Sequence, residues 1–137
     1  MPAPRWPSPY LALYACMKHA LEGLSESLDH EVRQFGIRVA LVEPYFTRTA
    51  LGAHSVPDAI TLHAYDEERA RAVATITASI ESALLPFTVA EEIARAINEP
   101  RRLRRPVGGQ ARLLSRVRRF MPAEPVDRQL RKSFGLA

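Results

Sequence analysis

One stretch of the sequence decides the fold: Tyr14-Ala-Cys-Met-Lys18-His-Ala-Leu-Glu-Gly-Leu-Ser-Glu-Ser-Leu28, followed shortly by Phe35-Gly-Ile-Arg-Val-Ala-Leu-Val-Glu-Pro44. In the first segment apolar residues recur at intervals of three and four, which is typical of an amphipathic helix. The second segment has a glycine near its start, the usual helix terminator, and continues as a short apolar run, which is typical of a strand covered on both faces. A helix, a tight turn and a buried strand together predict the second half of a β–α–β unit.

The limits of these two elements follow from their end signals. We expect the helix to begin with Ser8 as its cap and Pro9 at its first position, and to end near Gln34, before Gly36. The strand is expected over residues 37–43. The apolar stripe of the helix consists of Leu13, Met17, Ala20, Leu21, Leu24, Leu28 and Val32.

The rest of the chain predicts further helices around a second strand. A loop is expected to about residue 64, with helices over 65–85, 88–98, 110–121 and 126–134 and a short strand over 103–107. Thr88-Val-Ala-Glu91 has the spacing of a capping box, so we expect the second of these helices to begin there. Gly135 is expected to end the last helix.

Tyr14 and Lys18 are the residues with recognisable chemistry. They lie four positions apart on the predicted helix, so both project from one face. A nearby ammonium stabilises a phenolate, so we expect Lys18 to lower the pKa of Tyr14 from its usual value of about 10. Such a tyrosine can exchange a proton with a carbonyl or an alcohol. Taken alone, this spacing is common, and a plain contact on the helix surface is the better explanation.

The context of the pair resembles the short-chain dehydrogenases/reductases, in which a Tyr–Lys helix leads into just such a strand. The likeness is specific over residues 8–49 and weaker beyond, where residues 105–108 and the closing Lys-Ser-Phe-Gly are similar to the family's C-terminal end. The resemblance implies an α/β fold, the C-terminal part of a Rossmann-like doubly wound parallel sheet without its first βαβαβ half. We expect one partial domain: an irregular N-terminus (1–8), the Tyr–Lys helix with the following strand, loop and helices (9–109), and basic C-terminal helices (110–137).

The resemblance also implies roles for individual residues. Tyr14 would be the general acid/base, and Lys18 would tune it and bind the nicotinamide ribose. The stretch Pro44-Tyr-Phe-Thr47-Arg-Thr49 is similar to the loop whose later residues touch NAD or NADP, so Pro44, Thr47 and Thr49 would be cofactor contacts. Ordinary loop hydrogen bonding explains the two threonines equally well. The substrate would be a carbonyl compound or a secondary alcohol, of a kind that the sequence does not specify.

Three features depart from the family's pattern. None of the six glycines forms the Gly-rich turn that receives a pyrophosphate, and the residue that chooses NAD or NADP lies in the missing half. The family's catalytic serine would fall at Met1 or Pro2, and Ser8 lies too close to Tyr14. Tyr45 replaces a usual glycine, and would point away or narrow the nicotinamide pocket. We therefore expect a truncated gene product, a misplaced start or a fragment, with exposed apolar faces and strand edges and poor stability alone.

Charge and composition narrow the remaining classes. Residues 1–100 carry 8 Lys and Arg against 13 Asp and Glu, whereas residues 101–137 carry 11 against 2. Such a basic segment can bind nucleic acid or an anionic membrane. A solvated helix face is the more common explanation for Arg112, Arg116 and Arg119, and nucleic-acid binding is not expected because no aromatic residues interleave with them.

Cysteine and histidine usage points away from disulfides and metals. The single cysteine, Cys16, rules out an internal disulfide, and we expect it to pack in the core. No run reaches the ~20 apolar residues of a membrane span, and the proline-rich start is unlike a signal peptide, so we expect a cytoplasmic protein. No metal site is predicted, because the histidines lack ligand spacing. They are His19, His30, His54 and His63.

Three functions stay open. The first is an NAD(P)-dependent oxidoreductase, with the activity of this chain alone in doubt. The second is a non-catalytic module that forms a homo- or hetero-oligomer through the Tyr–Lys helix. The third is a peripheral membrane protein that acts through residues 110–132.

Overall fold

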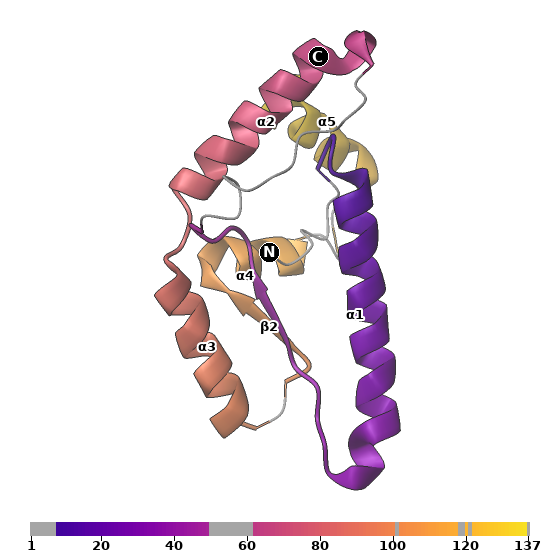
Figure 1. Ribbon diagram of the computed structural model, residues 1–137, viewed down its shortest axis with the longest axis vertical. Coiled ribbons are helices and arrows are strands. Elements are labelled where there is room, and N and C mark those ends of the chain that lie inside the picture. The colour runs from indigo at the N-terminus through magenta and orange to yellow at the C-terminus, as the bar shows by residue number, and fades with distance from the viewer. Residues whose placement is uncertain (1–7, 50–61, 101, 118–119, 121, 137) are drawn as a thin grey trace.

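The computed structural model describes residues 8–49, 62–100, 102–117, 120 and 122–136 (Figure 1). Within them the chain forms the predicted α/β fold around a parallel sheet of two strands. The helices and strands, with η for a 3-10 helix, are α1 (Ala12–Val32), η1 (Arg33–Phe35), β1 (Leu41–Pro44), η3 (His63–Tyr65), α2 (Asp66–Glu81), α3 (Pro86–Asn98), β2 (Arg104–Val107), α4 (Gly108–Val117) and α5 (Ala123–Ser133).

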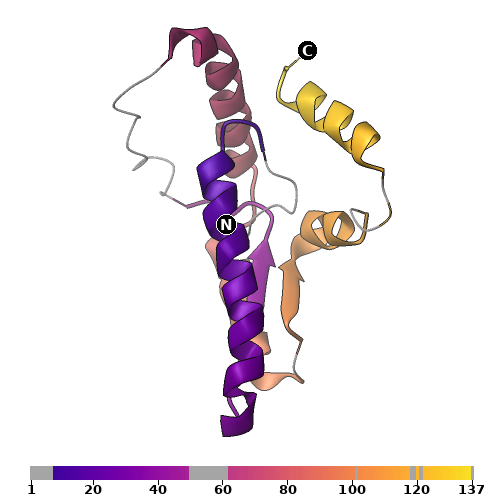
Figure 2. The same cartoon turned by 90° about the vertical axis from the view of Figure 1, so that its right-hand side faces the viewer.

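The sheet lies between two helices. β1 and β2 run parallel, with Leu41 opposite Arg104 and Pro44 opposite Val107. α1 lies on one side of this sheet and α3 on the other (Figures 1 and 2). Because α1 runs against β1, the N-terminal end of α1 lies toward the end of the sheet where both strands finish. This is the end at which open α/β sheets bind ligands.

β1 is shorter than predicted and begins at Leu41 rather than Ile37. The backbone N–H of Val39 is bound by the Asp29 carboxylate, and pairing with the second strand starts only where Leu41 N–H donates to the Leu103 carbonyl. Ile37 is exposed. A strand extends only as far as a partner offers hydrogen bonds, so the apolar run overstates its length.

The starts of two helices also differ from the predictions. α1 begins at Ala12 without a side-chain cap, because Tyr10 has a left-handed backbone (φ 62°) that helical residues do not adopt. α3 begins at Pro86, before the predicted capping box, since proline is already shaped for the first helical position. Gly36 and Gly135 end their elements with positive φ, as predicted.

The main cluster of buried apolar side chains lies between α2 and the C-terminal helix. Ala72 of α2 is completely buried against Phe134 and Leu136, and Ile76 and Leu130 pack around them. α5 is thereby held against α2 at the end of the molecule that lies beyond the strands (Figure 1).

The apolar stripe of α1 is exposed, as the sequence predicts. Leu13, Met17 and Leu24 are 83%, 64% and 64% exposed. The side of α1 that carries Ala15 and Asp29 is buried instead. In the part of the chain that the structure describes, no helix combines the length and the apolar character needed to cross a membrane.

Candidate active site

Tyr14 and Lys18 lie one turn apart in the N-terminal part of α1. Both side chains are half-buried, and Ala15 between them is buried. The Lys18 ammonium lies over the Tyr14 ring, with Nζ 5.5 Å from the ring centroid. The structure therefore brings the predicted pair together on one face, while its catalytic role stays a prediction.

The pKa of Tyr14 moves in the direction opposite to the predicted one. Burial raises the pKa of Tyr14 to about 12. The ammonium of Lys18 lies above the ring, where it is attracted by the π-electrons of the neutral phenol as well, and it does not offset the loss of hydration. Near neutral pH Tyr14 is consequently a phenol, a group that can donate a proton.

The loop after β1 places the predicted cofactor contacts at the carboxyl end of the sheet. Pro44 is buried as the last residue of the strand. Thr47 forms an isolated parallel bridge with Leu84, and the Arg48 N–H donates to the Leu84 carbonyl at 2.9 Å. Thr47 is half-buried and Thr49 is exposed. The loop is thus held from the side of α2, at the same end of the sheet as the start of α1.

Tyr45 does not point away from this end of the sheet. Its half-buried ring meets the Phe46 ring edge-on, with centroids 4.7 Å apart, and burial raises the pKa of its phenol. Both rings line a pocket of about 600 Å³ at the carboxyl ends of β1 and β2. The turn after α2 and the start of α4 complete its walls. Tyr14 and Lys18 are not among the residues that line this pocket.

Gly108 tests whether this end of the sheet can receive a pyrophosphate. It follows β2 directly and starts α4, as a phosphate-binding turn would. However, a Cβ at Gly108 would lie 2.8 Å from Leu84 Cδ1. The glycine therefore makes room for Leu84 and leaves no cradle for a phosphate. Gly108 therefore gives no support for a pyrophosphate site, and the contact of Lys18 with a nicotinamide ribose stays a prediction.

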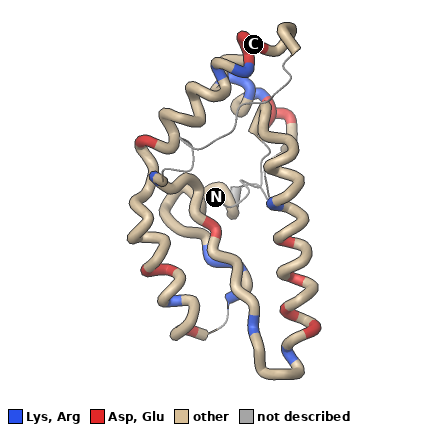
Figure 3. Tube along the Cα trace, viewed as in Figure 1, with Lys and Arg blue, Asp and Glu red and all other residues tan. Residues whose placement is uncertain are grey.

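Arg104 connects the sheet to the Tyr–Lys helix. Its guanidinium donates to Glu22 and Glu26 on α1 and to Glu43 on β1. Acidic residues follow α1, and basic residues lie on the segment beside it (Figure 3). This cluster holds α1 on the sheet through charge while the apolar stripe faces outward.

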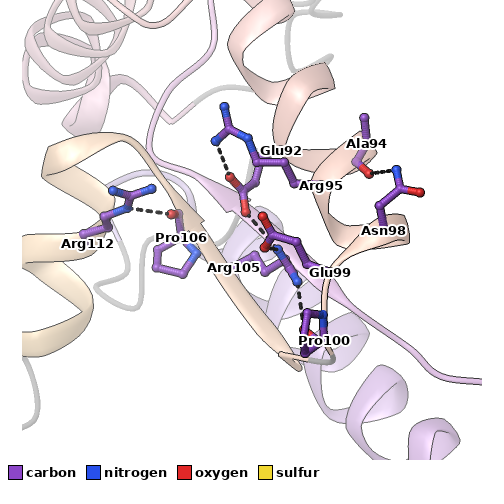
Figure 4. Close-up of polar contacts among 9 residues, drawn as sticks. All are labelled: Glu92, Ala94, Arg95, Asn98, Glu99, Pro100, Arg105, Pro106 and Arg112. Carbon is purple, nitrogen blue, oxygen red and sulfur yellow. Dashed lines mark hydrogen bonds and ion pairs between the residues drawn. The ribbon is translucent and has the colours of Figure 1, made fainter.

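Arg105, the next residue of β2, makes the equivalent connection to α3. It is 4% exposed, and its guanidinium donates to Glu92 Oε1 at 3.3 Å, to Glu99 Oε2 at 2.9 Å and to the Pro100 carbonyl at 3.1 Å (Figure 4). Successive strand residues point to opposite faces, which is why two adjacent arginines reach the two helices.

Asp29 fixes the far end of α1. It is 1% exposed and accepts hydrogen bonds from Arg33, from Arg38 and from the Val39 N–H. Sequence reasoning missed Asp29, Arg104 and Arg105. The sequence offered one signal for the arginines: both lie within a predicted strand, where charged residues need partners. Glu22 and Glu26, four residues apart on the predicted helix, were candidate partners.

The remaining candidates carry no catalytic arrangement. Cys16 is exposed, so the prediction that it packs in the core is wrong. His63 is exposed and pairs with Asp66 at 3.0 Å, whereas His54 lies outside the described residues. Over those residues no three His, Cys, Asp or Glu side chains gather as metal ligands would.

Known proteins match the segment that carries the pair. The family model of the short chain dehydrogenases matches residues 3–59. An uncharacterized oxidoreductase of Bacillus subtilis (strain 168) is 30% identical over 130 residues, which are 90% of this chain and 46% of that protein. An uncharacterized oxidoreductase of Schizosaccharomyces pombe is 32% identical over 103 residues, which are 73% of this chain and 42% of that protein.

A third relative matches a shorter segment. The 17-beta-hydroxysteroid dehydrogenase type 6 of Bos taurus is 42% identical over 40 residues, which are 29% of this chain and 13% of that protein. The chain spans less than half the length of each of these relatives. The family model and the two longer matches agree with the α/β fold and with the helix that carries Tyr14 and Lys18. Together these matches support a protein of the short-chain dehydrogenase family.

Proposed function

We propose that this chain carries the acid/base pair of an NAD(P)-dependent oxidoreductase that interconverts a carbonyl and a secondary alcohol. One observation carries the proposal: Lys18 Nζ lies 5.5 Å from the centroid of the Tyr14 ring at the head of α1, inside the segment that the family model matches. The names of the relatives, two oxidoreductases and one hydroxysteroid dehydrogenase, support redox chemistry.

The state of Tyr14 favours the reductive direction near neutral pH. A bound nicotinamide supplies the hydride. Tyr14, whose pKa is raised to about 12, donates its phenolic proton to the substrate's carbonyl oxygen. Lys18 then stabilises the phenolate through its charge. In the oxidative direction the same phenolate accepts the proton of the alcohol, which requires a higher pH or an ammonium that moves from above the ring to the phenolate oxygen.

The cofactor is proposed to meet this chain at its nicotinamide end. Lys18 has three donors that can hold ribose hydroxyls. Pro44 ends the strand beside this region, and Thr47 and Thr49 follow it. The Leu84 side chain occupies the space beside Gly108. The contacts to the pyrophosphate must therefore come from other segments or from a partner. The activity is therefore proposed for the whole protein and not for the described residues alone.

Turnover by the protein as purified from its source cells tests the proposal. Ketones, aldehydes and secondary alcohols are offered with each nicotinamide cofactor, and the absorbance of the reduced cofactor is followed. Tyr14→Phe should lower kcat by about 10²- to 10⁴-fold. Tyr10→Phe is the control, because Tyr10 lies just before α1 but its hydroxyl binds Glu68 at 2.6 Å. Equal loss in both variants, or no turnover with any substrate, would count against the proposal.

A second role is favoured by the exposed stripe of α1. We propose that this face pairs with a second copy of the chain or with a longer relative. The large apolar residues that remain uncovered along it support this, since such patches mark interaction sites. They are Leu13, Met17, Leu21, Leu24 and Leu28. If this is the only role, the chain co-purifies with a larger dehydrogenase and binds no nucleotide itself.

A further inference from the structure

The pocket at the carboxyl ends of β1 and β2 has an unusual lining, because none of the described residues around it is charged. Its apolar walls include Phe46, 7% exposed, and Val107, 3% exposed. Its polar groups are two serine hydroxyls, the Tyr45 phenol and the Gln110 amide. At about 600 Å³ it lies within the usual range of small-molecule sites, about 300–1,000 Å³. A charged ligand would lose its hydration there without gaining a counter-charge.

The two serines present acceptors and not donors. Ser79 Oγ–H donates to the Thr75 carbonyl at 2.8 Å, and Ser82 Oγ–H donates to the Ala78 carbonyl at 3.0 Å, both within α2. A hydroxyl has one proton and two lone pairs. With that proton used inside the helix, each Oγ can only accept a hydrogen bond from a ligand. The pocket therefore favours a ligand that carries a hydrogen-bond donor close to Ser79 and Ser82.

The loop after β1 adds a neutral group to the lining. The Tyr45 phenol is half-buried, and its ring is fixed edge-on against Phe46. Burial raises the pKa of Tyr45, so the phenol stays neutral near pH 7. Among the described residues that line the pocket, an anion would find neither an arginine nor a lysine.

We propose that this pocket binds an uncharged, largely apolar small molecule whose hydroxyl group donates its one proton to the Oγ of Ser79 or of Ser82. Because the pocket opens at the same end of the sheet as the start of α1, this ligand would be the body of the substrate, a reading that rests on the proposed function. The binding itself does not, since Tyr14 does not line the pocket.

Three probes of equal chain length test the selectivity: 1-octanol, octyl methyl ether and octanoate. The first is neutral and has a donor, the second is neutral without a donor, and the third is an anion. Ligand-observed NMR titrations on the full chain give their dissociation constants. 1-Octanol should bind about 3- to 10-fold more tightly than the ether. Octanoate should bind more weakly than both.

A double serine variant and a control variant test whether Ser79 and Ser82 cause the preference for 1-octanol over the ether. The double change Ser79→Ala and Ser82→Ala should bring the ratio of octanol to ether affinity close to one. Ser133→Ala is the matched control, because Ser133 Oγ–H likewise donates to a helix carbonyl, that of Leu130 at 2.8 Å, but does not line the pocket. Each ratio is measured within one variant, so a partly destabilised variant still gives a valid result.

Two results would overturn the inference. One is octanoate binding as tightly as 1-octanol, and the other is an unchanged affinity ratio in the double serine variant. Neither would affect the role of Tyr14 and Lys18, which the turnover of Tyr14→Phe tests separately. Conversely, a protein that shows no turnover but keeps the octanol preference would leave the pocket standing and reject the proposed reaction.

Discussion

Burial keeps Tyr14 protonated near neutral pH, which is the state that the proposed reduction requires. A carbonyl reduction needs a neutral donor near the carbonyl oxygen, and burial holds the pKa of Tyr14 near 12, well above neutral pH. Lys18 over the ring then has its main effect after the proton has left, when a phenolate must be stabilised. Under the proposed function, Tyr14 would therefore be an acid in the resting state and a base only when the medium is alkaline.

The pH dependence of folding tests the state of Tyr14. An unfolded tyrosine ionises at about 10, whereas folded Tyr14 does so at about 12. Its contribution to stability is thus complete below pH 10 and is lost as the pH rises toward 12. Tyr14→Phe should make the free energy of unfolding less dependent on pH across this window, as measured by denaturant titration. A tyrosinate absorbance midpoint for Tyr14 at or below 10, taken as the difference between wild type and variant, would contradict this.

The elements are joined by charge more than by apolar packing around the sheet. Arg104 and Arg105 connect one short strand to helices on both of its faces, and Asp29 fastens the end of α1 to the start of β1. Because these groups are largely buried, removing one partner leaves others without their hydrogen bonds.

Asp29 gives the clearest test at this scale. Asp29→Ala should lower the free energy of unfolding by about 2–4 kcal/mol, because a backbone N–H and two arginines lose a buried acceptor. Asp29→Asn should cost less, since an amide oxygen can still accept from Val39. Chemical denaturation followed by circular dichroism measures both. Glu31→Gln, an exposed change two positions on, should stay within about 0.5 kcal/mol of wild type. Similar values for Asp29→Ala and Glu31→Gln would remove Asp29 from this role.

The contact between α2 and α5 makes a second prediction. Phe134→Ala should lower the free energy of unfolding by about 3 kcal/mol, because the ring is 7% exposed against Ala72 and Leu136. Phe87→Ala is the matched control, since the Phe87 ring on α3 is 71% exposed. The melting temperatures of the two variants, measured by thermal unfolding, test this prediction. Equal melting temperatures would mean that α5 does not pack on α2 in solution.

The helices and strands also show which structural features can be predicted from the sequence. α1 and its Tyr–Lys face follow from the spacing of residues within one segment, and the structure has both. The start of β1 could not be predicted, because it depends on where Leu103 and Arg104 offer hydrogen bonds from 60 residues away in the chain. The predicted start of α3 at the capping box was wrong because Pro86, two residues earlier, already begins the helix. The pKa of Tyr14 depends on burial, which spacing does not reveal.

At the scale of the whole molecule, the exposed apolar stripe of α1 is a surface for which the chain itself provides no cover among the described residues. A helix held to its own sheet by glutamates, with leucines and a methionine outward, resembles half of an interface. The chain also covers less than half the length of its relatives. The exposed stripe is the observation that supports the proposed pairing through α1.

Charge placed on the stripe tests this assembly. Leu24→Asp should reduce the mass of the complex measured by analytical ultracentrifugation, because an aspartate cannot be buried in an apolar interface without a partner. Gly23→Asp adds the same charge about 100° around the helix, where a Cβ has nothing within 4 Å, and should leave the mass unchanged. A wild-type chain that sediments as a monomer, or equal dissociation in both variants, would speak against an interface at this face.

The account as a whole depends on hydride chemistry with Tyr14 as the proton donor. The most direct measurement uses a reduced nicotinamide cofactor carrying deuterium at the transferable position, the protein purified from its source cells, and mass spectrometry of the alcohol formed from a ketone. We predict one deuterium in the alcohol with the wild-type protein, a strongly reduced yield with Tyr14→Phe, and an undiminished yield with Tyr10→Phe. Unlabelled product from the wild type, or full labelling with Tyr14→Phe, would contradict the account.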